Sequence, residues 1–304
     1  MKKLLLMLCA LFAFTLCQAQ ENPNNKVDGE SINAAIQEIR SRINSLKQEI
    51  SALQNKNCSC SCHEGDADDP YNGHEYVDLG LPSGLKWATC NVGAESPEEY
   101  GAYFAWGATE EQEVCDWVHC PYQTQDTEDY MSVKFLKYLE STSSGYKDPS
   151  ATDADALKTV LDPEDDAAHV NWKGSWRMPT IEEQKELRDE CYWKWVTSYN
   201  GKDVEGYVVY KVKDSADRGR MTNNNSSYTP VGSYSVSDPH LFLPAAGYRY
   251  SSDLYNVGSD GYYWSSSLNS SDPSNAFGLY FGSDGVFWRS YNRRYGQSVR
   301  PVCP

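Results

Sequence analysis

The stretch NAFGLYFGSDGVFW, residues 275–288, alternates between two kinds of side chain. Side chains of a strand point to opposite faces with a period of two. One face would receive a tyrosine and three small residues, namely Ala276, Gly278, Tyr280 and Gly282. The opposite face would receive large apolar residues, namely Phe277, Leu279 and Phe281. Ser283-Asp284-Gly285 is a turn sequence, so the stretch predicts a β-hairpin with two different faces.

The chain that follows this turn has the composition of a binding surface. Its last 18 residues, FWRSYNRRYGQSVRPVCP, combine tyrosine, arginine, serine and asparagine, and residues 214–304 contain neither lysine nor glutamate. Tyrosine offers a large contact area with few rotatable bonds, whereas lysine and glutamate lose rotamer entropy and hydration when covered. Arginine adds planar donors that suit carboxylates or aromatic stacking. Eight of the 22 tyrosines lie in the last 57 residues: Tyr248, Tyr250, Tyr255, Tyr262, Tyr263, Tyr280, Tyr291 and Tyr295.

Other elements can be placed upstream. Residues 76–88 predict strand, turn and strand, with Pro82-Ser83-Gly84 at the reversal. Thr180 followed by Glu183 forms a capping box that starts a helix in WRMPTIEEQKELRDE, residues 176–190. We expect a second helix over residues 129–140, with Val133, Leu136 and Tyr138 or Leu139 facing inward. The rest of the chain from about residue 73 onward is typical of short strands and ordered loops.

Several motifs of this head occur in a fixed order: GLKWATCNVGA, YGAYFAWGAT, LDPEDDAAHVNWKGSWRMPTIEEQKEL, FLPAAGYR, GYYWSSS and SVRPV. In this order they resemble the exported C-type-lectin-fold proteins of the Fibrobacter succinogenes major paralogous domain type, and the related variable proteins that retroelements diversify. The resemblance covers residues 73–304 and implies a compact α+β, C-type-lectin-like head with two helices around a small twisted sheet. It also implies that residues 264–302 supply the strands and loops of an exposed binding face.

The resemblance further implies diversification by adenine mutagenesis. An asparagine codon altered at its first two bases yields Tyr, Ser, Asp, Arg, Gly, Phe or Leu, but never Lys, Glu, Gln or Trp. Three residues of the segment cannot arise from such a codon: Trp264, Trp288 and Gln297. Either they belong to an unvaried scaffold, or they argue against diversification. The alternative is a polar segment on a stable fold with no retroelement involved. The candidates for ligand contact are Asn269, Ser271, Asp272, Asn275, Phe277, Tyr280, Phe287, Arg289, Tyr291, Asn292, Arg293 and Tyr295.

Two of these candidates conflict with the alternation. Phe277 and Tyr280 fall on opposite faces of the predicted strand, so one of them belongs to the core. On grounds of burial we expect Phe277 to be that residue.

The N-terminus predicts export. Lys2 and Lys3 precede the apolar run 4–16, and Cys17-Gln18-Ala19 supplies a cleavage site, so residues 1–19 predict a secretory signal peptide. Lipid attachment at Cys17 is the less favoured alternative, because Leu16 is bulkier than the residues usual there. We therefore expect a secreted or cell-surface protein. Its net charge of -16 makes nucleic acid an unsuitable partner.

A stalk separates the signal from the head. After a linker over residues 20–30, residues 31–57 predict a short coiled coil, which is expected to form a homotrimer, with a dimer as the alternative. An amphipathic helix lying on the protein's own head is the other interpretation. The apolar seam alternates steps of four and three: Ile32, Ile36, Ile39, Ile43, Leu46, Ile50 and Leu53.

Cysteines follow the stalk. Residues 58–72 form a Cys-rich acidic linker in which Cys58, Cys60 and Cys62 predict disulfides between subunits, since zinc ligands usually stand further apart. Local or heterogeneous pairing is the alternative. An exported head favours further disulfides, such as one between Cys90 and Cys303.

The motifs of catalysis are missing. The five histidines, at 63, 74, 119, 169 and 240, form no recognisable ligand pair, and no phosphate-binding glycine loop occurs. Cys191 and Cys303 lack a neighbouring cysteine at useful spacing for a metal-based oxidase. We therefore expect neither an enzyme nor a cofactor.

Calcium requires separate consideration, because classical lectins of this fold bind sugar through it. The Glu-Pro-Asn or Gln-Pro-Asp triplet is absent from the head. The acidic residues of segment 153–166 would form either a solvated loop, which we favour, or an oxygen-rich calcium site: Asp153, Asp155, Asp162, Glu164, Asp165 and Asp166.

These observations predict a ligand-binding or adhesion protein that a coiled coil oligomerises, with a protein or glycan ligand on a surface. The rival interpretation is a structural subunit of an envelope or fimbrial assembly, whose tyrosine-rich face packs against a permanent neighbour.

Overall fold

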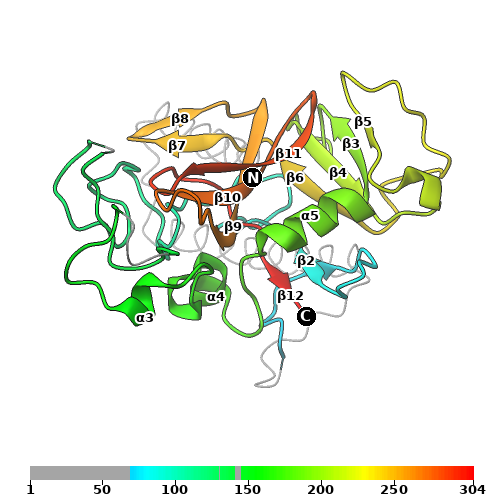
Figure 1. Cartoon of the computed structure of the whole chain (residues 1–304). Helices are drawn as coiled ribbons and strands as arrows, with labels where there is room; N and C mark the ends of the chain where they lie inside the picture. The colour runs from blue at the N-terminus through cyan, green and yellow to red at the C-terminus, as the bar shows by residue number, and fades with distance from the viewer. Residues whose placement is uncertain (1–68, 130, 141–144) are drawn as a thin grey trace, which may run out of the picture. The chain divides into compact units, whose positions relative to one another are not determined.

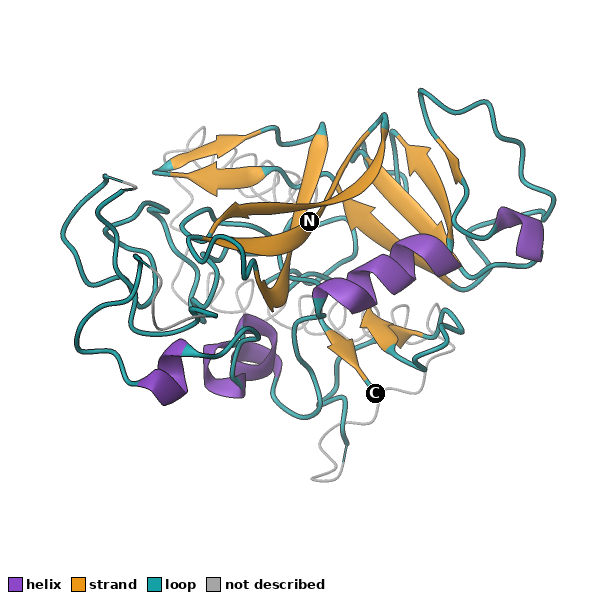
Figure 2. Cartoon of the chain, in the orientation of Figure 1, coloured by secondary structure: helices purple, strands orange, loops and turns teal. Residues whose placement is uncertain are grey.

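The computed structural model describes residues 69–129, 131–140 and 145–304. These residues form an α+β fold in which strands outnumber helices, as Figure 1 and Figure 2 show, so the predicted fold class is confirmed at this level. The predicted signal segment, coiled coil and cysteines 58–62 lie outside the described residues. No helix among the described residues is long and apolar enough to cross a membrane.

One sheet has the strand order β5-β3-β4-β6. Its members are β3 (Tyr192–Val196), β4 (Gly206–Tyr210), β5 (Met221–Thr222) and β6 (His240–Pro244). All five residues of the central strand β4 are buried, because both faces of this sheet are covered. Trp193 and Tyr207 face one apolar cluster, and Val208 and Phe242 face another.

A second sheet has the order β11-β10-β9. Its strands are β9 (Asp260–Leu268), β10 (Asn275–Gly282) and β11 (Gly285–Asn292). Gly282 pairs with Gly285, so Ser283 and Asp284 form the loop of the predicted hairpin. Leu279 and Phe281 enter the same core cluster as Trp193, so one face of this sheet is core.

Two smaller sheets complete the strands. β1 (Tyr76–Val77) and β2 (Lys86–Ala88) form the predicted antiparallel pair, and β12 (Val302–Cys303) adds to β2 near the C-terminus. β7 (Tyr248–Tyr250) and β8 (Asp253–Tyr255) form a separate hairpin. In Figure 1 this hairpin, β7–β8, lies on the same side of the molecule as β11.

The longest described helix is α5 (Ile181–Glu190), which packs against β9, β10 and β11. The predicted capping box is confirmed, because the Thr180 side chain accepts from the Glu183 N–H and the Glu183 carboxylate accepts from the Thr180 N–H. The other helices are short: α3 (Asp153–Ala156), α4 (Ala167–Trp172), and the 3-10 turns η1 (Pro163–Asp165) and η2 (Ser215–Asp217).

The predicted helix over residues 129–140 is wrong, because its described residues form turns and an isolated bridge. Phe135 bridges both Gln123 and Lys147, so the chain is extended there. Val133 and Phe135 are fully buried and Lys134 between them is only half-buried, which is the alternation of an extended chain. Tyr138 has a φ of 65°, which a right-handed helix does not accommodate. The apolar residues of this segment are core residues, but their spacing is not helical.

The five cysteines of the described residues are free thiols: Cys90, Cys115, Cys120, Cys191 and Cys303. The expected bridge between Cys90 and Cys303 is therefore wrong for this structure. Cys303 pairs with Lys86, and the antiparallel pairing continues as Ala88 donates to Pro301 and Val92 donates to Val299, so the chain carries Cys90 away from Cys303. A disulfide needs Cα atoms within about 7 Å.

A buried carboxylate organises the long loop between β5 and β6. Asp217 accepts hydrogen bonds from the hydroxyls of Tyr228 and Tyr234 and from the N–H groups of Val231 and Gly232, at 2.6 to 2.8 Å. Burial raises the pKa of Asp217, but these hydrogen bonds together outweigh burial and lower it from 3.8 to about 2. The ionised form is therefore the one that holds this loop.

We expect Asp217→Asn to lower the free energy of unfolding at pH 7 by about 2 kcal/mol. The four donors would then face an uncharged amide, and hydrogen bonds to a charged group are stronger than those to a neutral one. Since the folded pKa is lowered, the stabilisation is complete above pH 3.8 and is lost as the pH falls towards about 2. Urea unfolding of both proteins between pH 7 and pH 2 should show a smaller difference at the acidic end. A pH-independent difference would contradict this assignment.

Candidate functional site

The register of β9, β10 and β11 collects aromatic rings on the face of the sheet opposite Leu279 and Phe281. One end of this face, at Trp264 and Ala276, belongs to a second core cluster. Tyr280 lies directly opposite Phe287 on one side and Tyr262 on the other. Arg289 and Tyr291 follow Phe287 at intervals of two, so they share this face. The alternation predicted for β10 is therefore confirmed.

The β7–β8 hairpin extends this face with further rings. Tyr248 lies 4.8 Å from Tyr262 and 5.5 Å from Tyr295 between ring centroids, and Tyr250 lies 5.5 Å from Tyr295. We call the whole set the tyrosine surface: Tyr248, Tyr250, Tyr255, Tyr262, Tyr280, Phe287, Tyr291 and Tyr295. Apart from Tyr262, every member is at least partly exposed.

Two arginines stack on this surface. The Arg289 guanidinium lies 5.1 Å from the centroid of Tyr280 and 5.7 Å from that of Phe287. The Arg294 guanidinium lies 4.8 Å from the centroid of Tyr250 and bonds Glu128 at 3.0 Å. These distances are typical of cation–π contacts, so the rings hold the guanidinium groups flat against the protein.

A pocket opens within the tyrosine surface. Its walls are Tyr248, Tyr262, Tyr291 and Tyr295, Gln297 completes the lining, and its cavity volume is about 80 Å³. Pockets for small ligands have the same kind of lining, mainly apolar with few polar groups. The space suits one small group rather than an extended ligand.

Gln297 is the unusual member of this lining. Its side chain is fully buried, yet neither its Oε1 nor its Nε2 has a hydrogen-bond partner among the described residues. A Cβ built at Gly278 would lie 3.3 Å from Oε1, so the carboxamide occupies space that a glycine leaves open. Buried polar groups without partners are rare, because each one costs about 1–3 kcal/mol.

Tyr248, Tyr262 and Tyr291 are neutral at physiological pH. Burial raises the pKa of Tyr262 and of Tyr291 far above the ordinary value, and it raises the pKa of Tyr248 as well. The hydroxyls of Tyr248, Tyr291 and Tyr295 make no hydrogen bond within the described part of the chain. The pocket therefore presents uncharged rings and hydroxyls that are available to a ligand.

The structure divides the twelve sequence candidates into groups. Four candidates belong to the tyrosine surface: Tyr280, Phe287, Tyr291 and Tyr295. A fifth candidate, Arg289, stacks on it. Five candidates lie at the other end of the β10–β11 hairpin or in the loop before it: Asn269, Ser271, Asp272, Asn275 and Asn292. This second group is tied together, since Asn292 donates to Asn275 at 2.6 Å and Asn275 donates to Asp272 at 2.7 Å.

Two candidates lie elsewhere. Arg293 is a correction, because it is 0% exposed and donates to the carbonyl oxygens of Lys137, Tyr138 and Pro273 at 3.2 to 3.4 Å. Its burial lowers its pKa to about 10, so it remains charged at neutral pH. Phe277 lies on the core face of β10, as expected from the alternation, but it is only half-buried at the end of that face.

The three residues that the diversification hypothesis assigned to the scaffold differ in exposure. Trp264 and Gln297 are fully buried, which fits a scaffold role. Trp288 is 42% exposed on the opposite face of β11, where Lys185 and Arg188 of α5 approach its ring within 5.8 Å. Its exposure leaves it available for contact with a partner.

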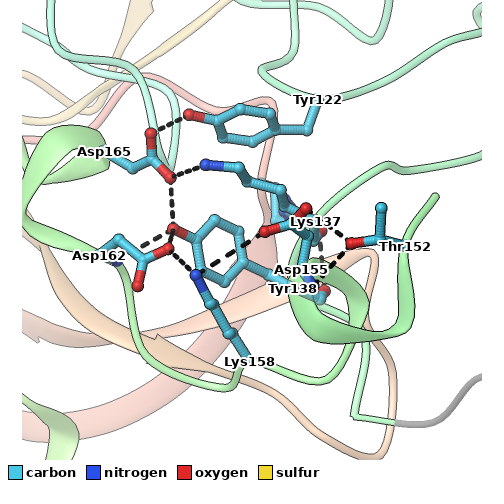
Figure 3. A network of polar contacts seen from close by, with 9 residues as sticks. Tyr122, Lys137, Tyr138, Thr152, Asp155, Lys158, Asp162 and Asp165 are labelled. Carbon is cyan, nitrogen blue, oxygen red and sulfur yellow. Dashed lines mark hydrogen bonds and ion pairs between the residues drawn. The ribbon is translucent and has the colours of Figure 1, made fainter.

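The acidic segment expected to be a solvated loop contains a polar network around the buried Asp165, which Figure 3 shows. Asp165 is buried and accepts from the hydroxyls of Tyr122 and Tyr138 and from Lys137 Nζ, the last at 2.9 Å. Burial raises the pKa of Asp165, but these donors outweigh burial and lower it. The solvated-loop expectation is therefore wrong for this residue.

The neighbouring carboxylates also have protein partners. Asp162 accepts from Lys158 Nζ at 2.5 Å, and the buried Asp166 caps the N-terminus of α4. Carboxylate oxygens of Asp162, Glu164 and Asp165 lie within 4.8 Å of one another, which is close enough for a shared cation. Lysine ammonium groups already neutralise two of the three, so the arrangement acts as a structural ion-pair network.

The histidines of the described residues each have a partner. His74 stacks on Trp172 at 3.8 Å, and the rings of His119, His169 and His240 contact Asp116, the Trp176 carbonyl and Tyr199 respectively. Cys191 is fully buried, and burial raises the pKa of its thiol. None of these groups stands beside the pocket.

Sequence reasoning missed three contributors to the pocket. Tyr248 and Tyr262 were noted only as part of the tyrosine excess, and Gln297 was assigned to the scaffold. The density of tyrosine after residue 247 was the available signal. Nothing in the sequence indicated that the β7–β8 hairpin would lie beside β9.

Together these features define an α+β protein with an exposed tyrosine-rich sheet face. A family model described as a domain of unknown function, DUF8237, matches residues 185–302. The matched segment contains every strand from β3 to β11, and hence the whole tyrosine surface. Searches of curated proteins and of solved structures found no match.

Arg289 and Arg293 provide a matched test of where the structure places these two candidates for ligand contact. Arg293→Ala should lower the free energy of unfolding by about 3 kcal/mol or more, because it leaves a cavity and unpartnered carbonyl oxygens. Arg289→Ala should change it by less than about 0.5 kcal/mol, because Arg289 is exposed. Chemical denaturation of both variants measures the difference, and equal effects would contradict the placement of Arg293.

Proposed function

We propose that this chain is an exported, cell-surface ligand-binding or adhesion protein whose C-type-lectin-like head binds its ligand with the tyrosine surface. The observation that carries the proposal is the exposure of aromatic rings and a stacked arginine on one sheet face. Phe287 is 42% exposed, and Arg289 beside it is exposed as well. Exposed aromatic clusters with arginine are typical of interaction sites.

The lectin-like fold is supported by the elements around this face. The two longest helices among the described residues, α4 and α5, accompany a small sheet, and α5 covers the face of β9–β11 that is opposite the tyrosine surface. Strands β9 to β11 and the segment after them come from the part of the chain that the motif order assigned to binding.

Oligomerisation would strengthen such a site. A coiled coil over residues 31–57 would join several heads, and linked heads gain avidity of about a hundredfold or more on a repeating surface when the geometry allows it. A homotrimer fits the apolar seam of the stalk, and a dimer would serve the same purpose. The ligand is then a protein or glycan displayed in many copies.

We expect the double variant Phe287→Ser/Arg289→Ser to lose at least about tenfold in affinity, because it removes one exposed ring and one stacked guanidinium. The measurement is binding of the labelled full chain to arrays of immobilised glycans and cell-surface proteins. Val236→Ser is the matched control, since Val236 is 69% exposed and lies outside the tyrosine surface.

Equal binding by the double variant and the wild type would contradict the assignment of the site. If the full chain binds nothing on either array and precipitates without a partner, the structural-subunit interpretation holds instead. A permanent interface leaves an isolated subunit with an uncovered apolar face, and such a face promotes aggregation.

Diversification of the tail predicts a genomic signature. A reverse-transcriptase gene should lie near a second copy of the DNA that encodes residues 264–302, and the two copies should differ only at adenines. Genome sequencing of the locus checks this directly. The absence of such a copy would contradict diversification and leave the binding proposal intact.

A further inference from the structure

We infer that the pocket of Tyr248, Tyr262, Tyr291, Tyr295 and Gln297 binds a methylated ammonium group, such as the trimethylammonium head of a choline-type ligand. This inference rests on the proposed function and names the chemistry that the tyrosine surface recognises. The ring arrangement, the cation contacts of the surface and the unpartnered carboxamide carry it.

The four rings form an arc around a small space. Tyr291 lies 5.4 Å from Tyr262, Tyr262 lies 4.8 Å from Tyr248, and Tyr248 lies 5.5 Å from Tyr295, all between centroids. Neighbouring planes are inclined by 50° to 69°, so the rings turn around the space instead of stacking in one direction. An arc of aromatic rings is the arrangement that recognises quaternary ammonium groups.

The surface already attracts cations to its rings. Arg294 lies 4.8 Å from the centroid of Tyr250, and Arg289 lies 5.1 Å from that of Tyr280. Arg294 also lies 5.6 Å from the centroid of the pocket ring Tyr295, but within the described residues no lysine or arginine lies over Tyr248, Tyr262 or Tyr291. Of these three, Tyr248 and Tyr291 are partly exposed, so their rings are available to a cation from outside.

The charged group beside the pocket favours a cation. The Gln297 carboxamide is uncharged and offers both an unpartnered acceptor and an unpartnered donor, whereas the Asp260 carboxylate accepts from the pocket residue Tyr262 at 3.4 Å and from Asn256 at 2.8 Å. The whole chain has a net charge of -16, which attracts cations at long range.

Methyl groups on the nitrogen match the apolar walls. An unmethylated ammonium carries three N–H donors and needs that many acceptors when it is desolvated. No carboxylate is part of the lining, so such an ion would leave donors without partners. Methyl groups remove these donors and contact the ring faces instead.

Choline and its neutral analogue, in which a carbon atom replaces the nitrogen, test the charge directly because the two have the same shape. Titration of the full chain by calorimetry, with tyrosine fluorescence as a second readout, should show choline binding at least about tenfold more tightly. Equal affinity for the two compounds would overturn the inference, because apolar fit alone would then explain binding.

Ring removal tests the location. Tyr248→Leu should weaken choline binding about tenfold, whereas Tyr248→Phe keeps the ring and should retain most of the affinity. Tyr248 is half-buried in the β7–β8 hairpin and belongs to none of the core clusters, so both variants should fold. Thermal unfolding of both variants is the control. If both variants bind choline as tightly as the wild type, the assignment of choline binding to this pocket is overturned.

The outcomes also separate this inference from the proposed function. If choline does not bind but the arrays still detect binding that Phe287→Ser/Arg289→Ser removes, the ligand class is wrong and the proposed function stands. If a methyl glycoside binds in place of choline and Tyr248→Leu abolishes that binding, the pocket holds a neutral sugar ring and the inference is overturned.

Discussion

The tyrosine surface depends on the strict alternation of β10. Leu279 and Phe281 belong to the core, and Tyr280 between them points to the opposite face. A shift of one residue in the pairing with β11 would turn the core residues outward and the tyrosine inward. The two-residue loop between Gly282 and Gly285 and the burial of Phe281 hold this register. The binding face and the core are therefore specified by the same strand.

The chemistry of the surface follows from its composition. Its rings support one another and hold Arg289 and Arg294, so the surface presents few freely rotating side chains. A ligand that covers it would order little that is not already ordered, which lowers the entropic cost of binding. Uncharged hydroxyls and one buried carboxamide, Gln297, supply the polar contacts.

Local patterns allowed several elements to be predicted. The β10–β11 hairpin, the strand pair β1–β2 and the capping box of α5 each depend on residues a few positions apart. The segment 129–140 could not be predicted this way, because Val133 and Phe135 pack with residues outside the segment, and the Phe135 ring centroid lies 4.2 Å from the distant Arg293 guanidinium. Arg293 was misplaced for a related reason, since its carbonyl acceptors at Lys137 and Tyr138 lie more than 150 residues away in the sequence.

The sequence alone determined the composition of the C-terminal third and the two faces of its central strand, because both follow from residue type and a period of two. Only the tertiary structure decided which tyrosines meet. It brings the β7–β8 hairpin beside β9, and Gln297 beneath the rings at the space left by Gly278. The pocket is made by side chains from separate segments, and packing between segments is not encoded in any short pattern.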